Sequence, residues 1–464
     1  MPRSILGMAV TAAILAAPGT LVAQGFQVNE HGTCVMGRAG VATPKPCGDG
    51  SAVFYNPAGV AGMTGITTSI GVTGIYAYGS FTDDYTSDET GLENSLVPVP
   101  HFYATYGITP QLTAGFGFFV PYGLGTKWPV TFEGRFNGYD NDLRSMYFQP
   151  TLAYKLHDLV SVGAGFDFVL GSVELNQRLD FSEQLAPPPA PAGTTLGQLG
   201  IPFHTDFANV NLKASGATGI AGNFGLLITP GEGVSIGFRY LTRSKLDYQG
   251  DAVFDPVETG IVLPAGNPFG VPAGTSLDLV IAGLGLFDDG ALLADQGGDA
   301  SITMPDQVSV GVAVSPTDAV TFLAEWQWVH WSLFNELELV FDNAGTKLIE
   351  ENYQDTNGFR MGVEWIADPR FTVRGGYLYH EGAAPPETVT PLLPEGSRNE
   401  FTGGLGVRLN DRLHADVAYQ YIHQNKRRGR VREPDAGTAP SVELNSGLYK
   451  FNAHLFGLTL TATF

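Results

Sequence analysis

The clearest pattern along the 464-residue chain is an alternation of apolar with small or polar side chains, with a period of two. In the last stretch, one face carries Phe456, Leu458, Leu460, Ala462 and Phe464. Glycine and threonines occupy the other face. A period of two is that of a β-strand, because successive side chains point to opposite sides. The alternation recurs over residues 401–409 and 413–421, so the chain is expected to be all-β.

Six tight turns alternate with long, polar, proline-rich connections. The turns fall at 108–111, 156–158, 229–233, 315–318, 367–370 and 409–412. The long connections are 82–98, 125–141, 182–207, 255–299, 342–352, 383–398 and 425–446. Short turns at one end and long loops at the other are typical of an outer-membrane barrel, with the short turns on the periplasmic side. The count predicts a transmembrane antiparallel β-barrel of about fourteen strands.

A soluble β-sandwich would show the same alternation, but two features favour the membrane barrel. The small or polar face carries isolated charges in mid-strand, as a wet lumen would. The aromatic residues Trp326, Trp328 and Trp331 gather near a strand end and resemble an interfacial girdle. The chain ends in Phe464 on an apolar face, as final strands of such barrels commonly do.

Composition excludes several classes of protein. The formal net charge of −21 argues against a nucleic-acid partner, which requires a basic face. Charged residues make up 15% of the chain, against about 25% in a typical soluble domain, which disfavours a cytosolic enzyme. No nucleophile elbow, phosphate-binding loop or zinc-protease motif is present, so no enzyme, cofactor, metal site or catalytic residue is expected. A membrane-embedded phospholipase or protease is the enzymatic alternative, but no spacing selects a catalytic triad.

The N-terminal residues form a separate segment. Arg3 precedes a short apolar run over residues 5–17, and cleavage is expected after Ala23. This pattern predicts a secretory signal peptide over residues 1–23, with a retained anchor as the alternative. The mature chain would then begin with residues 24–64, which are rich in glycine, proline and polar residues and are not expected to form a strand pair, and continue as a barrel over 65–464.

Several motifs resemble those of the long-chain fatty acid transporter family of the outer membrane (FadL/TodX type). They are GFQVNE at 25–30, MGRA at 36–39, AVFYNPAG at 52–59, PYGLGT at 121–126 with Gly134-Arg135, MPDQVSVG at 304–311, WVHWS at 328–332 and TPLLPE at 390–395 with Arg398. They follow the family's order over essentially the whole mature chain. The resemblance implies that residues 24–64 form a plug, or hatch, inside the barrel.

This resemblance implies passive uptake of hydrophobic compounds, with long-chain fatty acids as the first expectation. A substrate would be caught among the outer loops, move to an inner pocket gated by the hatch, and leave sideways near the third strand. The resemblance places the hatch motif at Asn56, Pro57 and Ala58. It places the inner pocket at Phe26. It places the lateral gap at Gly115, Gly117 and Pro121. The alternatives are a simple Asn-Pro turn, an ordinary buried Phe26, and strand glycines without a special role.

Two of the long loops carry unexpected apolar residues. The residues expected to form a capture surface are Leu199, Ile201, Phe203, Leu279, Ile281, Leu284 and Phe287. Apolar clusters in exposed loops are typical of binding surfaces. They could equally pack on one another as a lid, and the two readings are compatible.

The chain departs from the fatty acid transporters where an inward cation is expected to meet the substrate carboxylate. It has Gly171-Ser172-Val173 at that place, with Arg178 and Lys213 as substitutes. Neutral hydrocarbons or aromatics are therefore an alternative substrate class. A structural or adhesin-like barrel without transport is a further alternative, which the N-terminal plug motif disfavours.

Two further features concern partners and cross-links. Cys34 and Cys47 are the only cysteines, and an exported chain meets oxidising conditions, so a disulfide is expected, with two free buried thiols as the alternative. Zinc is not expected to bind there, because His31 is the only nearby third ligand. The basic run from Lys426 to Arg432 could contact lipopolysaccharide phosphates or simply be solvated. The protein is expected to be a monomer.

Overall fold

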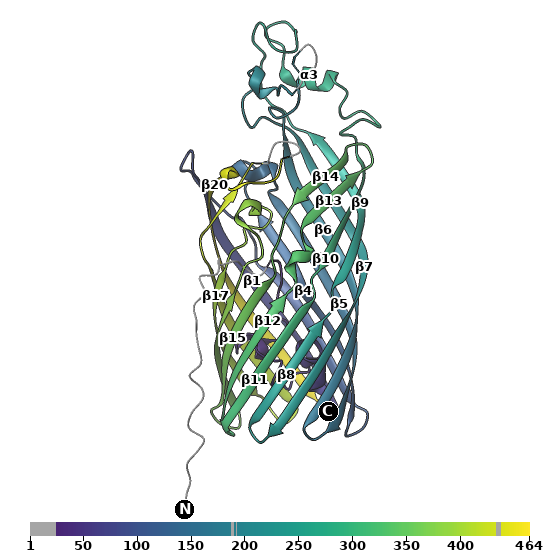
Figure 1. Cartoon of the computed structure of the whole chain (residues 1–464), viewed down its shortest axis with the longest axis vertical. Helices are drawn as coiled ribbons and strands as arrows, with labels where there is room; N and C mark the ends of the chain where they lie inside the picture. The colour runs from purple at the N-terminus through teal and green to yellow at the C-terminus, as the bar shows by residue number, and fades with distance from the viewer. Residues whose placement is uncertain (1–24, 187–189, 192, 433–437) are drawn as a thin grey trace, which may run out of the picture.

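The structure is a computed structural model that describes residues 25–464 apart from 187–189, 192 and 433–437. The signal peptide predicted at residues 1–23 lies outside the described residues. The described chain forms a tall, closed β-barrel of tilted antiparallel strands (Figure 1).

The barrel wall has fourteen strand positions, of which nine are single strands and five are each divided into two. The single strands are β1 (Ile66–Asp83), β3 (Val97–Gly107), β4 (Leu112–Lys127), β5 (Asp140–His157), β6 (Val160–Asp180), β7 (Asp206–Gly231), β16 (Phe371–His380), β17 (Arg398–Arg408) and β20 (Asn445–Thr463). The divided positions are β8 (Val234–Leu241) with β9 (Ser244–Pro256), β10 (Gln296–Met304) with β11 (Gln307–Thr317), β12 (Val320–Val329) with β13 (Glu336–Phe341), β14 (Gly345–Glu350) with β15 (Thr356–Ile366), and β18 (Leu413–Gln424) with β19 (Arg427–Arg430). The predicted all-β, fourteen-stranded barrel is confirmed.

The remaining elements are short. Strand β2 (Glu89–Gly91) pairs antiparallel with the end of β1, opposite residues 80–82. The α-helices are α1 (Thr33–Met36), α2 (Ala52–Tyr55) and α3 (Leu277–Gly283). The 3-10 helices are η1 (Pro57–Val60), η2 (Glu133–Phe136), η3 (Gly197–Leu199), η4 (Trp331–Leu333), η5 (Pro386–Thr388) and η6 (Val442–Leu444). Among the described helices, none is long and apolar enough to cross a membrane.

The first and last strands close the wall. Strands β1 and β20 pair antiparallel along almost their whole length, from Thr67 opposite Thr463 to Asp83 opposite Gly447. A closed barrel leaves no sheet edge exposed to lipid, and an edge there would carry costly unpaired backbone groups.

Side chains alternate between the two faces of the wall, as the period of two predicts. On β1 and β20, Ile70 and Leu458 point outward and are exposed, whereas Ser69 and Thr459 point inward and are buried. The predicted position in an aromatic girdle on the outer face agrees with the structure for Trp326, whose side chain is 36% exposed there. It is wrong for Trp331, which is fully buried, because η4 turns the chain inward after β12.

The six predicted tight turns all join neighbouring strands, for example 108–111 between β3 and β4. The long connection predicted at 342–352 is wrong, because β13 and β14 form a hairpin that extends the wall there. Leu337, Leu339 and Ile349 alternate with polar residues and are buried, so a short strand pair is more stable than a solvated loop.

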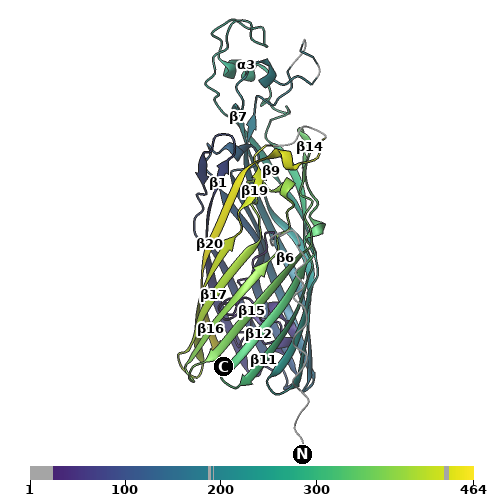
Figure 2. The ribbon, with the colours of Figure 1, turned by 60° about the vertical axis from the view of Figure 1, so that its left-hand side comes forward.

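Two long loops form a lobe beyond the barrel mouth. The described residues of 182–205 (without 187–189 and 192) and residues 257–295 stand above the rest of the molecule and include η3 and α3 (Figures 1 and 2). At the opposite end, the N-terminal segment lies inside the barrel as the purple ribbon of Figure 1. Most of the side chains between Gly25 and Val60 are buried. We call residues 25–64 the hatch.

Candidate functional site

The hatch is held to the wall by the Asn56-Pro57-Ala58 turn. The Asn56 side chain caps η1, since its Oδ1 accepts a hydrogen bond from the backbone N–H of Ala58 (3.1 Å). Asn and Pro are favoured at these two positions, because Asn supplies the cap and Pro presets the first helical φ. The Asn56 Nδ2 donates to the carbonyls of Thr43 (2.7 Å) and Leu226 (3.2 Å). One side chain therefore joins two parts of the hatch to strand β7.

Glycine in the wall lets the hatch backbone approach closely. A methyl group added at Gly225 would lie 2.1 Å from Asn56 Oδ1, and one at Gly237 would lie 1.9 Å from the carbonyl oxygen of Thr43. Neither contact is sterically allowed. Part of the high glycine content thus serves hatch packing as well as strand turns.

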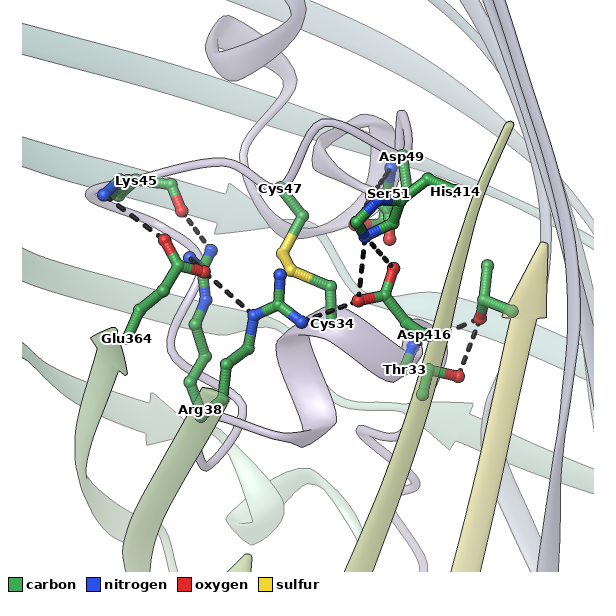
Figure 3. Close-up of a disulfide and its surroundings, with 12 residues drawn as sticks. Thr33, Cys34, Arg38, Lys45, Cys47, Asp49, Ser51, Glu364, His414 and Asp416 are labelled. Atoms are coloured by element: carbon green, nitrogen blue, oxygen red, sulfur yellow. Dashed lines mark hydrogen bonds and ion pairs between the residues drawn. A yellow bond between two sulfur atoms is a disulfide. The ribbon is translucent and has the colours of Figure 1, made fainter. Parts of the chain in front are cut away.

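A disulfide closes the middle of the hatch. Cys34 and Cys47 are joined, and the loop between them docks on β12 and β15 (Figure 3). Arg38 and Lys45 both form ion pairs with Glu364, at 3.4 and 3.3 Å. The cross-link ties together the two ends of the loop that makes these contacts.

The wall between β3 and β4 is interrupted in its upper half. The two strands pair only from Gly107 opposite Thr113 to Phe102 opposite Phe118. Beyond that point β3 continues to Val97 paired with β1 alone, and β4 continues to Lys127 paired with β5 alone. A bulge in the β4–β5 register between Phe119 and Tyr122 bends β4 away from β3 at this place.

The hatch supplies part of the missing pairing. Gln27 and Tyr122 form an antiparallel bridge. The Val28 N–H donates to the carbonyl of Pro121 (2.9 Å), and the Gly123 N–H donates to the carbonyl of Phe26 (3.0 Å). Higher up, the Asn94 side chain donates to the carbonyl of Gly125 (3.3 Å). The free edge of β4 is therefore hydrogen-bonded to the hatch and to the loop that precedes β3, and not to a neighbouring strand.

The predicted gap residues divide into two groups. Pro121 lies in the bulge and accepts the hydrogen bond from the hatch. Gly115 and Gly117 do not lie at the interruption, because both pair with β3 on one side and β5 on the other. The prediction that these two glycines lie in the gap is therefore wrong. They face inward, and a methyl group at either would come within 2.9 Å of Val53, so they make room for the hatch.

A cavity of about 450 Å³ runs through this interruption, a size within the range of small-molecule sites. On the lumen side it is lined by Ile75, Ala77, Ile422, Phe451, Ala453 and Leu455. At the wall it is lined by residues 97–100 of β3, 118, 120 and 123–126 of β4, and the outward-facing Arg144 and Met146 of β5. Because residues of both faces share one cavity, it connects the lumen with the outer surface of the barrel.

Phe26 borders the cavity and belongs to an aromatic cluster. Its ring lies 4.8 Å from Trp331, 5.7 Å from Phe334 and 6.2 Å from Tyr122. The ring is buried, so the N-terminal segment forms one wall of the cavity. The predicted position of Phe26 beside an inner cavity agrees with this geometry, and its movement on substrate binding stays a prediction.

Charged side chains meet at the end of the cavity beside the hatch. Gln420 Nε2 donates to Glu30 (2.9 Å) and to Glu400 (2.5 Å), so one amide joins a hatch carboxylate to a wall carboxylate. Burial raises the pKa of the Glu30 carboxyl, and the nearby Glu400 raises it further. Arg398 lines the same end of the cavity. Sequence analysis found Arg398 only as part of a motif and missed Glu30 and Glu400 as a pair, because barrel closure alone brings them together.

A second cavity, of about 500 Å³, lies at the short-turn end beneath the hatch. Its lining includes the disulfide and many charged or polar side chains, among them Glu364, Arg374, Arg408, Asp411, Arg412, His414 and Asp416. Arg374 bridges Glu364 (2.9 Å) and Asp416 (2.6 Å). Figure 3 shows Asp416 and His414 near the cross-link. The lining of this cavity is therefore more polar and more highly charged than that of the wall cavity.

The predicted capture residues lie in the lobe and differ in exposure. Ile201 and Ile281 are buried in the lobe, whereas Phe203, Leu279 and Leu284 are exposed. Leu199 is exposed at 36%, and Phe287 is half-buried. The loops thus have a small core of their own together with exposed apolar side chains. This arrangement is compatible both with a capture surface and with a lid.

The cations suggested by sequence lie away from the wall cavity. Lys213 pairs with Glu174 (2.9 Å) on the outside of the barrel, and the Arg178 guanidinium lies 6.0 Å from the Tyr139 ring. Neither residue lines the cavity. In the basic run, Arg428 pairs with Asp84, and the contact with lipopolysaccharide stays a prediction.

Comparison with known proteins places these features in a family. Residues 14–464 match the family model described as outer membrane protein transport protein (OMPP1/FadL/TodX). The long-chain fatty acid transport protein of Salmonella typhi is 26% identical over 453 residues, covering 95% of this chain and 94% of the relative.

Solved structures show the same fold. A FadL homologue from Pseudomonas aeruginosa superposes with a TM-score of 0.77 at 21% identity, covering 95% of this chain and all of that one. The toluene transporter TodX of P. putida gives a TM-score of 0.68 at 15% identity, covering 96% of this chain and 99% of that one.

Proposed function

Because the chain belongs to the outer membrane protein transport family (OMPP1/FadL/TodX), we propose that it takes up long-chain fatty acids passively. The protein is a β-barrel of the outer membrane. The observation that carries the proposal is the cavity at the β3–β4 interruption, since it is largely apolar and reaches both the lumen and the outer surface of the wall. A pore for polar solutes would need a wet channel along the barrel axis instead.

The proposed route begins in the lobe and ends at the wall. Exposed apolar residues such as Leu279 and Leu284 would capture the lipophile from outside. The lipophile would then descend to the wall cavity beside Phe26 and leave between β3 and β4 into the membrane. Each CH₂ group kept out of water along this path contributes about 0.8 kcal/mol.

Lateral exit fits the chemistry of the two cavities better than exit straight into the periplasm. A straight route would pass the chamber beneath the hatch, where charged residues such as Arg374 and Asp416 line the way. An alkyl chain would have to displace water from these ionic groups, which is unfavourable. The wall cavity instead opens beside outward apolar residues such as Phe118.

The hatch would act as the gate. Its segment Phe26–Val28 holds the free edge of β4, and its Phe26 ring closes the cavity against Trp331. Displacement of this short segment would enlarge the cavity and leave the rest of the wall hydrogen-bonded. We therefore assign Asn56, Pro57 and Ala58 to anchoring the hatch and the Phe26 segment to gating.

A transport assay tests the proposal. The protein is expressed in a Gram-negative host that lacks its own fatty acid transporter, and uptake of radiolabelled oleate and of toluene is measured. Oleate uptake above the empty-vector level is expected. Uptake of toluene alone would assign the protein to aromatic hydrocarbons, and uptake of neither would favour a structural or adhesin-like barrel.

A further inference from the structure

The wall cavity ends below the barrel mouth. On the three strands β1, β4 and β20, the lining residues nearest the mouth are Ala77, Thr126 and Phe451. No described residue of the lobe belongs to the lining. A lipophile caught in the lobe is therefore separated from the cavity by the side chains that fill the lumen between them.

A layer of four aromatic residues fills the lumen directly above this lining. Phe81, Trp128 and Tyr449 follow on the same inward faces of β1, β4 and β20, toward the mouth. The ring of Phe132, from the segment after β4, packs among them at 4.5 Å from Trp128 and 5.6 Å from Phe81. All four are at most 1% exposed. We call these four residues the aromatic layer.

Two segments at the mouth hold the aromatic layer in place, one after β4 and one at the end of β19. Strands β1, β20 and β19 run side by side up to the mouth, below the lobe (Figure 2). The Tyr449 hydroxyl donates to the carbonyl of Arg430 (3.1 Å), and the next residue, Val431, is 1% exposed. A methyl group on Gly134 would lie 2.9 Å from Val431 Cγ1. The two segments therefore meet over the aromatic layer.

The base of the lobe contacts the first of these segments through charged groups. His204 Nδ1 lies 2.5 Å from Glu133 Oε1, and the Nε of Arg135 donates to Asp206 (2.8 Å). Glu133 and Arg135 are in η2, directly after Phe132. The position of Phe132 is thus tied to the lobe.

The base of the lobe also contacts the second segment, through an aromatic ring. The Arg432 guanidinium lies 5.0 Å from the centre of the Phe203 ring and 4.8 Å from that of Tyr85. Arg432 directly follows Val431, and Phe203 is 56% exposed at the surface of the lobe. Residues 203–206 therefore contact both segments that cover the aromatic layer, and one of them is an exposed apolar residue expected to meet the ligand.

Two features show that the closed arrangement is not fully relaxed. His204 has a φ of 58°, a left-handed conformation that is disfavoured for a residue with a side chain. Arg430 is 1% exposed, and its Nε and Nη1 have no hydrogen-bond partner within the described part of the chain. Buried donors without a partner are unfavourable, so opening that admits water to Arg430 would offset part of the contacts that it breaks.

We propose that the aromatic layer is a second gate on the transport route, and that residues 203–206 open it when a lipophile binds to the lobe. This inference rests on the proposed function, because it names the step that links capture to the wall cavity. A lipophile that packs on Phe203 displaces Arg432 from the ring. Val431 then moves away from the aromatic layer with Arg432, and Phe132 follows with η2.

The test measures how exposed the aromatic layer becomes when a ligand binds. Purified Val431→Cys in detergent is labelled with a fluorescent maleimide, with and without saturating oleate. The two natural cysteines are joined, so they do not react. Val169→Cys is the matched control, because Val169 is also fully buried and faces inward, in the middle of β6, and does not line the wall cavity. Phe132→Cys is a second probe of the aromatic layer.

A second pair of variants tests the link to the lobe, in the Val431→Cys background. Phe203→Leu keeps an apolar side chain but removes the ring that contacts Arg432. Val262→Ala is its control, because Val262 is 64% exposed in the other loop of the lobe. Binding of radiolabelled oleate and heat-modifiable mobility are measured for every variant, so that loss of binding or of folding is recognised.

Oleate is expected to accelerate the labelling of Val431→Cys and of Phe132→Cys by about tenfold or more, because an open state that is populated to about 10% or less becomes the main one. Labelling of Val169→Cys should not change. Phe203→Leu should abolish most of the acceleration while oleate still binds, and Val262→Ala should keep it.

Three other results would overturn the inference, and they can be told apart. If oleate binds but leaves the labelling of both probes unchanged, the aromatic layer is not a gate, while the proposed transport stands. Equal acceleration at Val169→Cys would indicate general loosening of the lumen, and full acceleration in Phe203→Leu would remove the coupling to the lobe. If the wild type does not bind oleate, the proposed function itself fails.

Discussion

The backbone N–H of Val28 donates a hydrogen bond of 2.9 Å to the carbonyl oxygen of Pro121. One partner is in the hatch and the other is in the bulge of β4, at the point where β4 separates from β3. A proline at this bulge cannot donate to a neighbouring strand, but its carbonyl still needs a donor. The hatch therefore completes the wall at the place where the wall itself is incomplete, which links hatch position to the opening.

Replacement of Val28 by proline should release this contact selectively. Val28→Pro removes the N–H donor and leaves the Pro121 carbonyl unpaired, which costs about 1–3 kcal/mol of local stability. Hydrogen–deuterium exchange of the peptide covering residues 25–30 should become faster, and exchange in β5 and β6 should not change. Val28→Ala keeps the donor and is the control. Equal exchange in the two variants would show that the contact does not hold the segment.

The Asn56 side chain should be required for hatch docking and for uptake. Asn56→Asp places a carboxylate oxygen against the carbonyls of Thr43 and Leu226, where the wild-type amide donates to both. Asn56→Ala only removes the donor, so uptake should fall in the order wild type, alanine, aspartate. Uptake of labelled oleate and barrel heat-modifiability are measured together. Wild-type uptake by Asn56→Asp would remove the motif from the mechanism.

The Cys34–Cys47 cross-link should stabilise the docked hatch. A disulfide with a sequence separation of 13 residues is worth about 3 kcal/mol in the chain-entropy account. The double variant Cys34→Ser/Cys47→Ser should show faster proteolysis of the hatch with an intact barrel. In the wild type, maleimide should label the cysteines only after reduction. Labelling of both thiols without reduction would contradict the cross-link.

The barrel could be predicted from sequence because its determinants are local. Alternation with a period of two and tight turns fix each strand and its neighbour, and all six turns were placed correctly. Residues 342–352 were wrongly predicted as a long connection. They overlap the short hairpin of β13 and β14, whose polar sequence resembles that of a loop when its cross-strand partners are not known.

The candidate site was harder to predict because its parts meet only on barrel closure. Arg398, Glu30 and Ile75 are far apart in sequence, and no local pattern brings them together. Strand glycines have two uses that look alike in sequence. Gly115 and Gly117 accommodate Val53 of the hatch, whereas the bulge that opens the wall begins after Phe119.

Lateral exit through the β3–β4 opening is the central claim, and a bulky side chain at the rim tests it most directly. Gly125 faces outward at the rim of the cavity, and a side chain there would meet no described atom within 4 Å. Gly403 on β17 is equally open and faces outward away from the cavity, so Gly403→Trp is the matched control.

The decisive measurement is uptake of labelled oleate by cells that carry Gly125→Trp or Gly403→Trp, with oleate binding to the purified variants measured in parallel. Lateral exit predicts that Gly125→Trp binds oleate as the wild type does but fails to transport it, whereas Gly403→Trp does both. Wild-type transport by Gly125→Trp would contradict lateral exit and direct the route past the hatch into the periplasm.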